Sequence, residues 1–152
     1  MKKVYDTINQ YCVEHELLTN GDGIVIGLSG GMDSVCLLQV LAALRNEWQL
    51  RLVCVHVHHG IRGTAADEDA AFAQRLAAKY NISFRLYEMD IPQLAKEQGL
   101  SEEEAGRNYR YRCFEEVRKE LNFDKIAVAH HRDDQAETVL WQILRGSGLR
   151  GV

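Results

Sequence analysis

The residues best suited to chemistry in this chain form a short run of glycine and hydroxyl side chains with one carboxylate. The run reads Ser29, Gly30, Gly31, Met32, Asp33 and Ser34. The two glycines allow positive φ and close approach of a ligand, so successive backbone N–H groups can line a concavity that attracts anions. The two serines add hydroxyl donors. The pattern predicts a phosphate-binding loop between a strand and a helix.

The carboxylate of Asp33 separates this loop from a P-loop of the Walker type. No Gly-Lys-Ser/Thr ends the loop, so no lysine is available to reach the β and γ phosphates of a nucleotide. A carboxylate beside a polyphosphate makes sense when a hard divalent ion, Mg²⁺, bridges the two. We therefore expect Asp33 to hold Mg²⁺ and to take part in catalysis. The alternative is a plain strand-to-helix turn in which Asp33 only favours the helix dipole.

A second polar group lies further along the chain, where His130 and His131 precede Asp133 and Asp134. Asp133 is the better candidate for a second metal ligand. Asp134 suits a metal ligand and a helix cap equally well, because Glu137 follows at the spacing of a capping box. His130 is expected to act as a general acid or base or as a phosphate donor, and its alternative is a structural role at the end of a strand.

Arginines accompany apolar residues in the segment that follows residue 101. At about 100° per residue, Arg107, Arg110 and Arg118 fall on one helical side. Their apolar neighbours on that side are Tyr111, Phe114, Val117 and Leu121. An arginine on a buried face needs an anion, and a guanidinium suits phosphate oxygens. We expect Arg107 to act in catalysis and Arg110 to bind the nucleotide, the alternative being an ion pair with Glu103 or Glu104.

Alternating strands and helices are predicted to position these groups. Apolar runs predict strands over residues 24–28, 52–57, 82–87 and 126–129. Helical spacing and capping signals predict helices over residues 4–15, 37–44, 64–80, 101–121 and 135–144. The last of these helices is expected to stop at Gly146.

Continuous apolar strands separated by helices require a parallel sheet covered on both faces. We expect an α/β fold with a doubly wound parallel sheet, a Rossmann-like sandwich of three layers (α/β/α). In such sheets, ligands bind at the carboxyl ends of the strands. The polar groups that fall at this edge are residues 29–34, 56–60, 87–90 and 130–134. Their convergence predicts one site.

Composition limits the size and class of the protein. The 152 residues suit a single domain over residues 1–152, and with 46% hydrophobic and 26% charged residues the chain can bury a core. The 18 Lys plus Arg residues against 22 Asp plus Glu residues give a formal charge of −4. A freestanding nucleic-acid binder usually has a basic excess. If this chain contacts RNA, most of the affinity must come from elsewhere.

The cysteines and the apolar runs argue against other classes. The four cysteines form no C-x-x-C pair, which argues against a zinc ribbon, a thioredoxin-type site and an iron–sulfur cluster. The longest apolar runs are far short of the roughly 20 residues that span a bilayer. No apolar signal-peptide segment follows the amino terminus. We expect a cytoplasmic protein with reduced thiols.

With these residues in view, the chain resembles the PP-loop, or N-type, ATP pyrophosphatases, which cleave ATP between the α and β phosphates. It carries their signature Ser-Gly-Gly-x-Asp-Ser at residues 29–34 without departure. It is most similar to the members that join lysine to the wobble cytidine of an isoleucine tRNA. The segments that carry this narrower resemblance are residues 56–62, 107–112, 129–138 and 144–151.

The resemblance implies an adenine nucleotide alpha hydrolase-like fold with ATP and Mg²⁺ as cofactors. It also implies tRNA(Ile) and free lysine as substrates, an adenylated cytidine intermediate, and release of pyrophosphate and AMP. Such enzymes have a longer catalytic domain and further domains, so we expect this chain to be an incomplete N-terminal part of a longer enzyme. A missing strand would leave a sheet edge open to pairing, so a homodimer remains open.

One departure and two rival functions remain. Position 58 is often acidic or an amide in such proteins but is His58 here, so it receives no charge-dependent role. Within the family, a tRNA thiolation enzyme or an amidating ATP pyrophosphatase is the alternative. Outside it, residues 27–31 spell Gly-x-Ser-x-Gly, the nucleophile elbow of α/β-hydrolases, with Ser29 as nucleophile. The chain order of acid and histidine speaks against that hydrolase.

Overall fold

The computed structural model describes residues 2–14, 16–29, 31–60, 63–129 and 143–145. In these residues the strands form one sheet in the order β3-β2-β1-β4-β5. The strands are β1 (Gly23–Gly27), β2 (Arg51–His58), β3 (Ser83–Glu88), β4 (Lys125–Val128) and β5 (Ile143–Arg145). The pairs β1–β2, β1–β4 and β2–β3 are parallel. The predicted parallel sheet is therefore confirmed for its first four strands.

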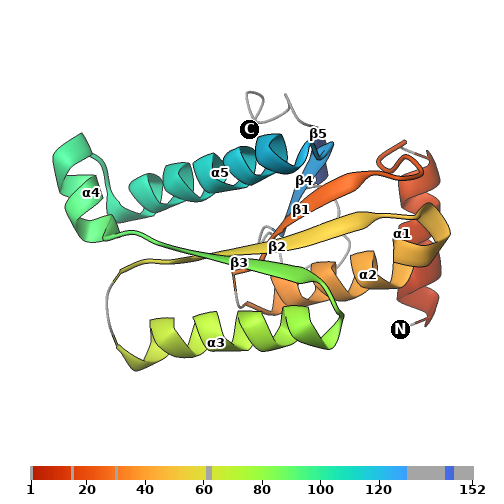
Figure 1. Cartoon of the computed structure of the whole chain (residues 1–152), viewed down its shortest axis with the longest axis horizontal. Helices are drawn as coiled ribbons and strands as arrows, with labels where there is room; N and C mark the ends of the chain where they lie inside the picture. The colour runs from red at the N-terminus through yellow and green to blue at the C-terminus, as the bar shows by residue number, and fades with distance from the viewer. Residues whose placement is uncertain (1, 15, 30, 61–62, 130–142, 146–152) are drawn as a thin grey trace.

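Helices cover both faces of this sheet, as Figure 1 shows. The helices are α1 (Lys2–Glu14), α2 (Met32–Trp48), α3 (Thr64–Lys79), α4 (Ile91–Gln98) and α5 (Glu102–Leu121). α2 and α3 lie on one face, α5 lies on the other, and α1 packs against α2. The predicted three-layer α/β/α architecture is confirmed. Within the described residues, no helix is both long and apolar enough to cross a membrane.

Alternate residues of the strands feed two separate hydrophobic cores. Ile24 and Ile26 of β1 belong to the core shared with α2 and α3, whereas Val25 belongs to the core under α5. All five residues of β1 are buried. A strand buried on both faces needs apolar residues at consecutive positions, which is why this strand is a continuous apolar run rather than an alternating one.

Helix α4 was not among the predicted elements, although the signals for it are present. The Asp90 side chain accepts a hydrogen bond from the Gln93 N–H at 3.0 Å and caps the amino end. Pro92 stands in the first turn, where the missing N–H costs nothing. Gly99 ends the helix with φ +68. A proline in the first turn is compatible with a helix, so Pro92 lies inside α4 and does not interrupt it.

The helix predicted over residues 135–144 is wrong at its end. Residues 143–145 form β5, which pairs antiparallel with β4 and sets Leu144 opposite Ile126. A short apolar run has no period that distinguishes strand from helix, and pairing with the free edge of β4 decides the outcome here. Residues 135–142 lie outside the described residues. The described sheet is therefore mixed, with one antiparallel strand next to β4.

Candidate functional site

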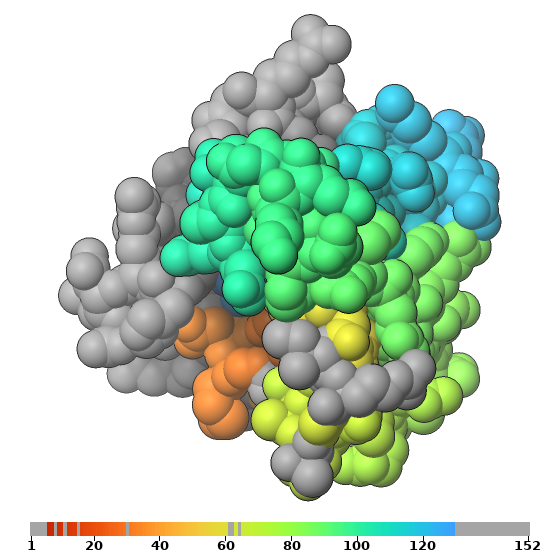
Figure 2. Space-filling model, turned by 90° about the vertical axis from the view of Figure 1, so that its left-hand side faces the viewer, coloured from red at the N-terminus to blue at the C-terminus, as the bar shows by residue number. Residues whose placement is uncertain are grey.

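A cavity of about 490 Å³ lies at the carboxyl ends of β1, β2 and β4. Its lining residues are Gly27, Leu28, Ser29, Val55, His56, Val57, His58, His59, Ala65, Ala66, Asp69, Arg110, Tyr111, Phe114, Val128 and Ala129. The strand order reverses between β1 and β4, so the cavity occupies the switch point where open α/β sheets bind ligands. Figure 2 faces this edge and shows a hollow bordered by α2 in orange, β2 in yellow and α4–α5 in green.

Close packing of α5 against β1 forms one wall of the cavity. A Cβ atom built on Gly27 would lie 2.7 Å from Cζ of Phe114, too close for any side chain. Gly27 therefore lets the Phe114 ring approach the strand directly. This contact brings Arg110, one turn earlier on α5, into the lining of the cavity.

The loop after β1 is braced by its own hydroxyl groups. Ser34 Oγ accepts hydrogen bonds from the N–H and the hydroxyl of Ser29, each at 3.2 Å. It donates in turn to the carbonyl oxygen of Gly31 at 2.9 Å. Ser29 Oγ also accepts from the Gly31 N–H at 3.3 Å. Ser34 is 2% exposed. Its hydroxyl therefore holds the loop together, whereas a donor to the ligand was predicted at this position.

Gly31 adopts an extended conformation, so the positive φ that a glycine allows is not used at this position. Its φ is −79 and its ψ is 165, the usual conformation of a helix N-cap. Gly31 is the N-cap residue of α2, and because it has no side chain it cannot bond the first N–H groups of the helix. Uncapped N–H groups at a helix start attract anions. Gly30 lies outside the described residues.

Asp33 and Met32 lie in the first turn of α2, and neither is among the residues that line the cavity. Asp33 is partly buried, and Met32 is 82% exposed. A carboxylate oxygen is the hard donor that Mg²⁺ prefers, and Mg²⁺ commonly uses only one or two carboxylates together with phosphate oxygens. The donor type of Asp33 thus fits Mg²⁺. Asp133 and Asp134, the other expected ligands, lie outside the described residues, as does His130.

The three arginines predicted on one side of α5 have different surroundings. Arg110 is partly buried and lines the cavity. Arg107 is exposed, 5.7 Å from the centre of the Tyr111 ring, so its predicted place on a buried face is wrong. Arg118 is bound by Glu115 at 2.5 Å and by the Phe123 carbonyl oxygen at 3.1 Å. Helical angles alone do not show which of two arginines one turn apart on the same side of a helix is buried.

The charge of Arg110 is poorly compensated. Burial lowers the pKa of the Arg110 guanidinium, and the nearby charge of Arg107 lowers it further, against the opposing effects of Tyr111 and Glu103. Among the residues that the structure describes, Arg110 makes no ion pair with a carboxylate. A partly buried cation in this state favours an anionic ligand in the cavity. The alternative considered for Arg110, an ion pair with Glu103 or Glu104, is not formed between these described residues.

Three histidines at the end of β2 belong to the site, and the sequence analysis gave none of them a role. His56 Nδ1 donates to the Leu28 carbonyl oxygen at 2.6 Å, directly before the loop. Burial lowers the pKa of His56, and that hydrogen bond partly opposes the shift. Burial and the charge of Arg110 lower the pKa of His59. Their signals in the sequence were their place at the end of a predicted strand and the resemblance of residues 56–62 to the family.

The hydrolase alternative finds no support in the described part of the chain. There, the hydrogen-bond partners of Ser29 Oγ are Ser34 and Gly31, not a histidine. A serine nucleophile needs a base within hydrogen-bond reach. The loop of Ser29 is therefore built to hold its own shape and not to activate this hydroxyl.

Three comparisons connect the site to known proteins. The profile of the PP-loop domain family matches residues 2–152. The tRNA(Ile)-lysidine synthase of Caldanaerobacter subterraneus subsp. tengcongensis is 49% identical over 152 residues, all of this chain and 32% of that protein. The enzyme of the same name from Clostridium tetani is 41% identical over 149 residues, 98% of this chain and 31% of that protein. The chain thus spans about a third of the length of these curated relatives.

Solved structures share the fold at lower identity. The U34-tRNA thiolase NcsA of Methanococcus maripaludis, solved with its [4Fe-4S] cluster, superposes with a TM-score of 0.67 at 21% identity, over 86% of this chain and 44% of that one. The NH3-dependent NAD synthetase of Campylobacter jejuni gives 0.60 at 19% identity, over 82% and 54%. The family profile spans both the braced loop and the cavity, and on this ground the chain belongs to the PP-loop domain family.

Proposed function

We propose that the cavity binds ATP with its β and γ phosphates against the loop of residues 29–34, so that the bond between the α and β phosphates is broken. The observation that carries this proposal is the uncapped start of α2 beside a cavity at the switch point of the sheet. The N–H groups of the loop and the Arg110 guanidinium are suited to stabilising pyrophosphate as it leaves.

Asp33 would hold Mg²⁺ in this arrangement, together with Asp133 and Asp134 as further ligands. Bound Mg²⁺ would neutralise the charge that develops on the leaving diphosphate. The role of this chain's carboxylates is to fix that ion beside the loop. Locating the α phosphate relative to Ser29, Asp33 and Asp133 in crystals soaked with ATP and Mg²⁺ would test the assignment.

We infer that the enzyme that contains this chain modifies tRNA(Ile) in the cytoplasm, because its relatives are named tRNA(Ile)-lysidine synthase. The cytosine 2-carbonyl oxygen of the wobble cytidine attacks the α phosphate, and pyrophosphate leaves. The ε-amine of free lysine then attacks the activated C2, and AMP leaves. Arg107 at the rim would stabilise charge on the phosphate, and His130 would move a proton.

The direct test uses the enzyme that contains this chain, an isoleucine tRNA transcript, ATP, Mg²⁺ and lysine. We expect one pyrophosphate and one AMP released per tRNA, with a mass gain at the wobble position that corresponds to lysine minus water. Release of ADP and phosphate would contradict cleavage between the α and β phosphates. We also propose that residues 1–152 belong to a single domain that activates the nucleotide. In the whole enzyme, further segments of the chain follow this domain.

A thiolation or amidating enzyme of the same fold is the second candidate. Its support is structural likeness at 21% and 19% identity, which concerns the fold alone. Cys12, Cys54 and Cys113 are buried and Cys36 is partly buried, and each is a free thiol. Supplying lysine, ammonia or a sulfur donor in parallel reactions decides among the three. Turnover that needs sulfur or ammonia and ignores lysine would favour the alternative.

We also propose that two chains form a homodimer. In the described part of the chain, β3 is the outer strand of the sheet, and no further strand pairs with its open edge. Leu86 on β3 is 46% exposed. An open edge with an apolar residue favours pairing with another chain. Sedimentation as a monomer up to about 100 μM would contradict the dimer; that range corresponds to a modest association free energy.

A further inference from the structure

His58 lies at the junction of three elements around the cavity. It is 2% exposed at the last position of β2. Its Nδ1 atom lies 2.9 Å from the Gly60 backbone nitrogen, and its Nε2 atom lies 2.7 Å from Oδ1 of Asp67 on α3. Both nitrogens of this buried ring are therefore used, one within the turn and one across to the neighbouring helix.

The partners determine where the ring proton lies. A backbone N–H can only donate, so Nδ1 of His58 must accept and carries no proton. In the neutral ring the proton then sits on Nε2, where it is donated to the Asp67 carboxylate. The bond from the side chain at 58 to the N–H two residues later has the connectivity of an Asx-turn. His58 thus takes the place that an aspartate or asparagine would occupy in such a turn.

The turn that His58 closes is locked against the start of α4. Gly60 has φ +83, and a Cβ atom there would lie 2.5 Å from the Met89 carbonyl oxygen. The Met89 N–H donates to the His58 carbonyl oxygen, and the Ile91 N–H donates to the His59 carbonyl oxygen, each at 3.1 Å. α4 in turn packs against α5. Through this turn, the end of β2 is connected to both helices.

The walls of the cavity depend on the same connections. Ala65, Ala66 and Asp69 of α3 line one side, and Arg110 and Tyr111 of α5 line another. Asp67 lies among the α3 residues, so its bond to His58 fixes the start of α3 relative to the turn. The distance between the α3 wall and the α5 wall therefore depends on His58, because its two ring nitrogens bond the turn on one side and Asp67 of α3 on the other.

We propose that His58 is a positioning residue for the nucleotide cavity: it accepts from the Gly60 N–H to shape the turn, and it donates to Asp67 to hold α3 against that turn. The requirement at position 58 is a hydrogen-bond acceptor placed like Nδ1, and positions 58 and 67 must not both carry negative charge. The use of ATP as a ligand to test this role rests on the proposed function, whereas the hydrogen bonds of His58 to Gly60 and Asp67 do not.

This requirement separates four substitutions. Asn in His58→Asn keeps an acceptor oxygen near the position of Nδ1, so the turn is retained. Leu in His58→Leu has no acceptor, which leaves the Gly60 N–H without a partner. Asp in His58→Asp keeps the acceptor but sets a second carboxylate near Asp67. Adding Asp67→Asn to that variant removes the repulsion while the turn remains closed.

The first test needs no ligand and uses NMR of the whole chain. The ¹⁵N shifts of the His58 ring should report the Nε2–H tautomer. Exchange of the Gly60 amide should be about tenfold slower in the wild type and in His58→Asn than in His58→Leu, as expected for one hydrogen bond gained or lost. A ring protonated at Nδ1 in the neutral state, or equal Gly60 exchange in all three proteins, would overturn the proposal.

The second test is the dissociation constant for ATP with Mg²⁺, measured by calorimetry. We expect His58→Asn, which keeps the turn but loses the bond to Asp67, to bind about threefold more weakly than the wild type, and His58→Leu and His58→Asp to bind about tenfold more weakly. His58→Asp with Asp67→Asn should recover to within about threefold. Glu120→Gln is the matched control, because it removes the ion pair between Glu120 at the end of α5 and Arg85 on β3, 2.6 Å apart, and should leave affinity unchanged since neither residue lines the cavity.

The rank order of the ATP dissociation constants tests the role of His58, and thermal melting shows whether each variant is folded. If His58→Leu does not fold, His58→Asp and its double variant still decide, because they differ only at position 67. Equal affinity of those two proteins would overturn the proposal. If the wild type binds no ATP, the proposed function fails, and the tautomer and Gly60 exchange still decide whether His58 holds the turn.

Discussion

At the scale of single residues, Asp33 has the most direct chemical role in the proposed function. Its carboxylate is partly buried in the first turn of α2, next to the uncapped N–H groups of that helix. We expect Asp33→Ala to abolish adenylation and to leave the fold largely intact, because the change removes the proposed Mg²⁺ ligand and no member of the hydrophobic cores. Pyrophosphate release measures the activity, and circular dichroism measures the fold. An active variant that needs no metal would contradict the role.

Arg110 supplies the second test at this scale. We expect Arg110→Leu to lower the rate of pyrophosphate release by about a hundredfold, the usual loss when one preorganised donor is removed from a site. Arg112→Leu is the matched control, because Arg112 is exposed two positions away and does not line the cavity. Equal losses in the two variants would mean that Arg110 acts only through the net charge of α5.

His56 makes stability depend on pH. Burial lowers the pKa of His56 below its ordinary value of 6.5, so the folded state binds this proton less readily than the unfolded state. Stability is therefore fully present above pH about 6.5 and is lost as the pH falls through the folded pKa. The nearby titratable groups are Asp69, which opposes the shift, and His58, which adds to it.

We expect His56→Asn to flatten this dependence. The amide nitrogen of Asn can replace Nδ1 as a donor to the Leu28 carbonyl oxygen, but it does not titrate. Urea unfolding of both proteins between pH 8 and pH 5 measures the effect, where these limits bracket the ordinary histidine range. The wild type should lose stability relative to the variant toward pH 5. A constant difference over this range would show that His56 is not the titrating group.

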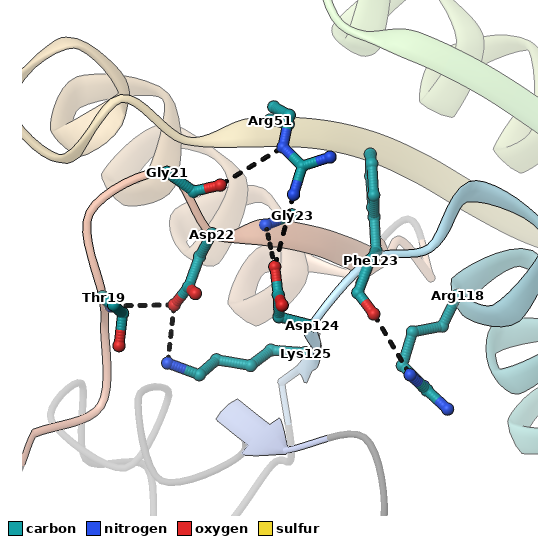
Figure 3. A network of polar contacts seen from close by, with 9 residues as sticks. All are labelled: Thr19, Gly21, Asp22, Gly23, Arg51, Arg118, Phe123, Asp124 and Lys125. Atoms are coloured by element: carbon teal, nitrogen blue, oxygen red, sulfur yellow. Dashed lines mark hydrogen bonds and ion pairs between the residues drawn. The ribbon is translucent and has the colours of Figure 1, made fainter.

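At the scale of elements, the amino edge of the sheet is held by a buried ion pair, drawn in Figure 3. Lys125 Nζ of β4 donates to Asp22 Oδ2 and to the Leu17 carbonyl oxygen, each at 2.6 Å. The Thr19 N–H also donates to Asp22 Oδ2, at 2.8 Å. Lys125 and Asp22 are 5% and 6% exposed. The pair therefore ties the segment before β1 to β4, at the end of the sheet opposite the cavity.

Breaking this pair from one side should be costly. We expect Lys125→Met to lower the free energy of unfolding by about 3–5 kcal/mol, because the Asp22 charge stays buried without its partner. Adding Asp22→Asn should recover much of the loss, since the amide oxygen still accepts from Thr19. Denaturant unfolding measures both. ATP affinity should change little in the folded fraction, because no member of the pair lines the cavity.

An exposed pair nearby provides the control. Arg51 Nη2 lies 3.4 Å from Oδ2 of Asp124, with side chains 54% and 49% exposed. Arg51→Met should cost no more than about 1 kcal/mol, because solvent screens such pairs. Equal costs at Arg51 and Lys125 would show that burial does not set the strength of this edge.

At the scale of the whole molecule, the net negative charge predicts that this chain binds RNA weakly by itself. Its formal charge is −4, whereas affinity for nucleic acid comes largely from cations that replace the counterions of phosphates. We expect this chain alone to bind an isoleucine tRNA with a Kd weaker than about 10 μM at physiological salt, in the range of non-specific binding. Fluorescence anisotropy measures this. Saturation at a nanomolar concentration of this chain would contradict the prediction and show that these residues supply most of the affinity for tRNA.

The sequence by itself determined the framework of the protein. Continuous apolar runs at 24–28 and 52–57 predicted buried parallel strands, and Ser101 with Glu104 predicted the start of α5, where the Ser101 side chain indeed accepts from the Glu104 N–H at 3.1 Å. The Ser-Gly-Gly-x-Asp-Ser run predicted the loop and the family. These features are readable because they depend on local periodicity, capping and turn chemistry.

Only the tertiary structure decided which of the candidate groups meet. Arg107 and Arg110 are three residues apart on α5, yet Arg107 is exposed and Arg110 is partly buried and lines the cavity. The bonds of His56 to Leu28 and of Lys125 to Leu17 join residues 28 and 108 positions apart. Such contacts arise when whole strands and helices pack, and no local pattern in the chain encodes which partner each side chain will find.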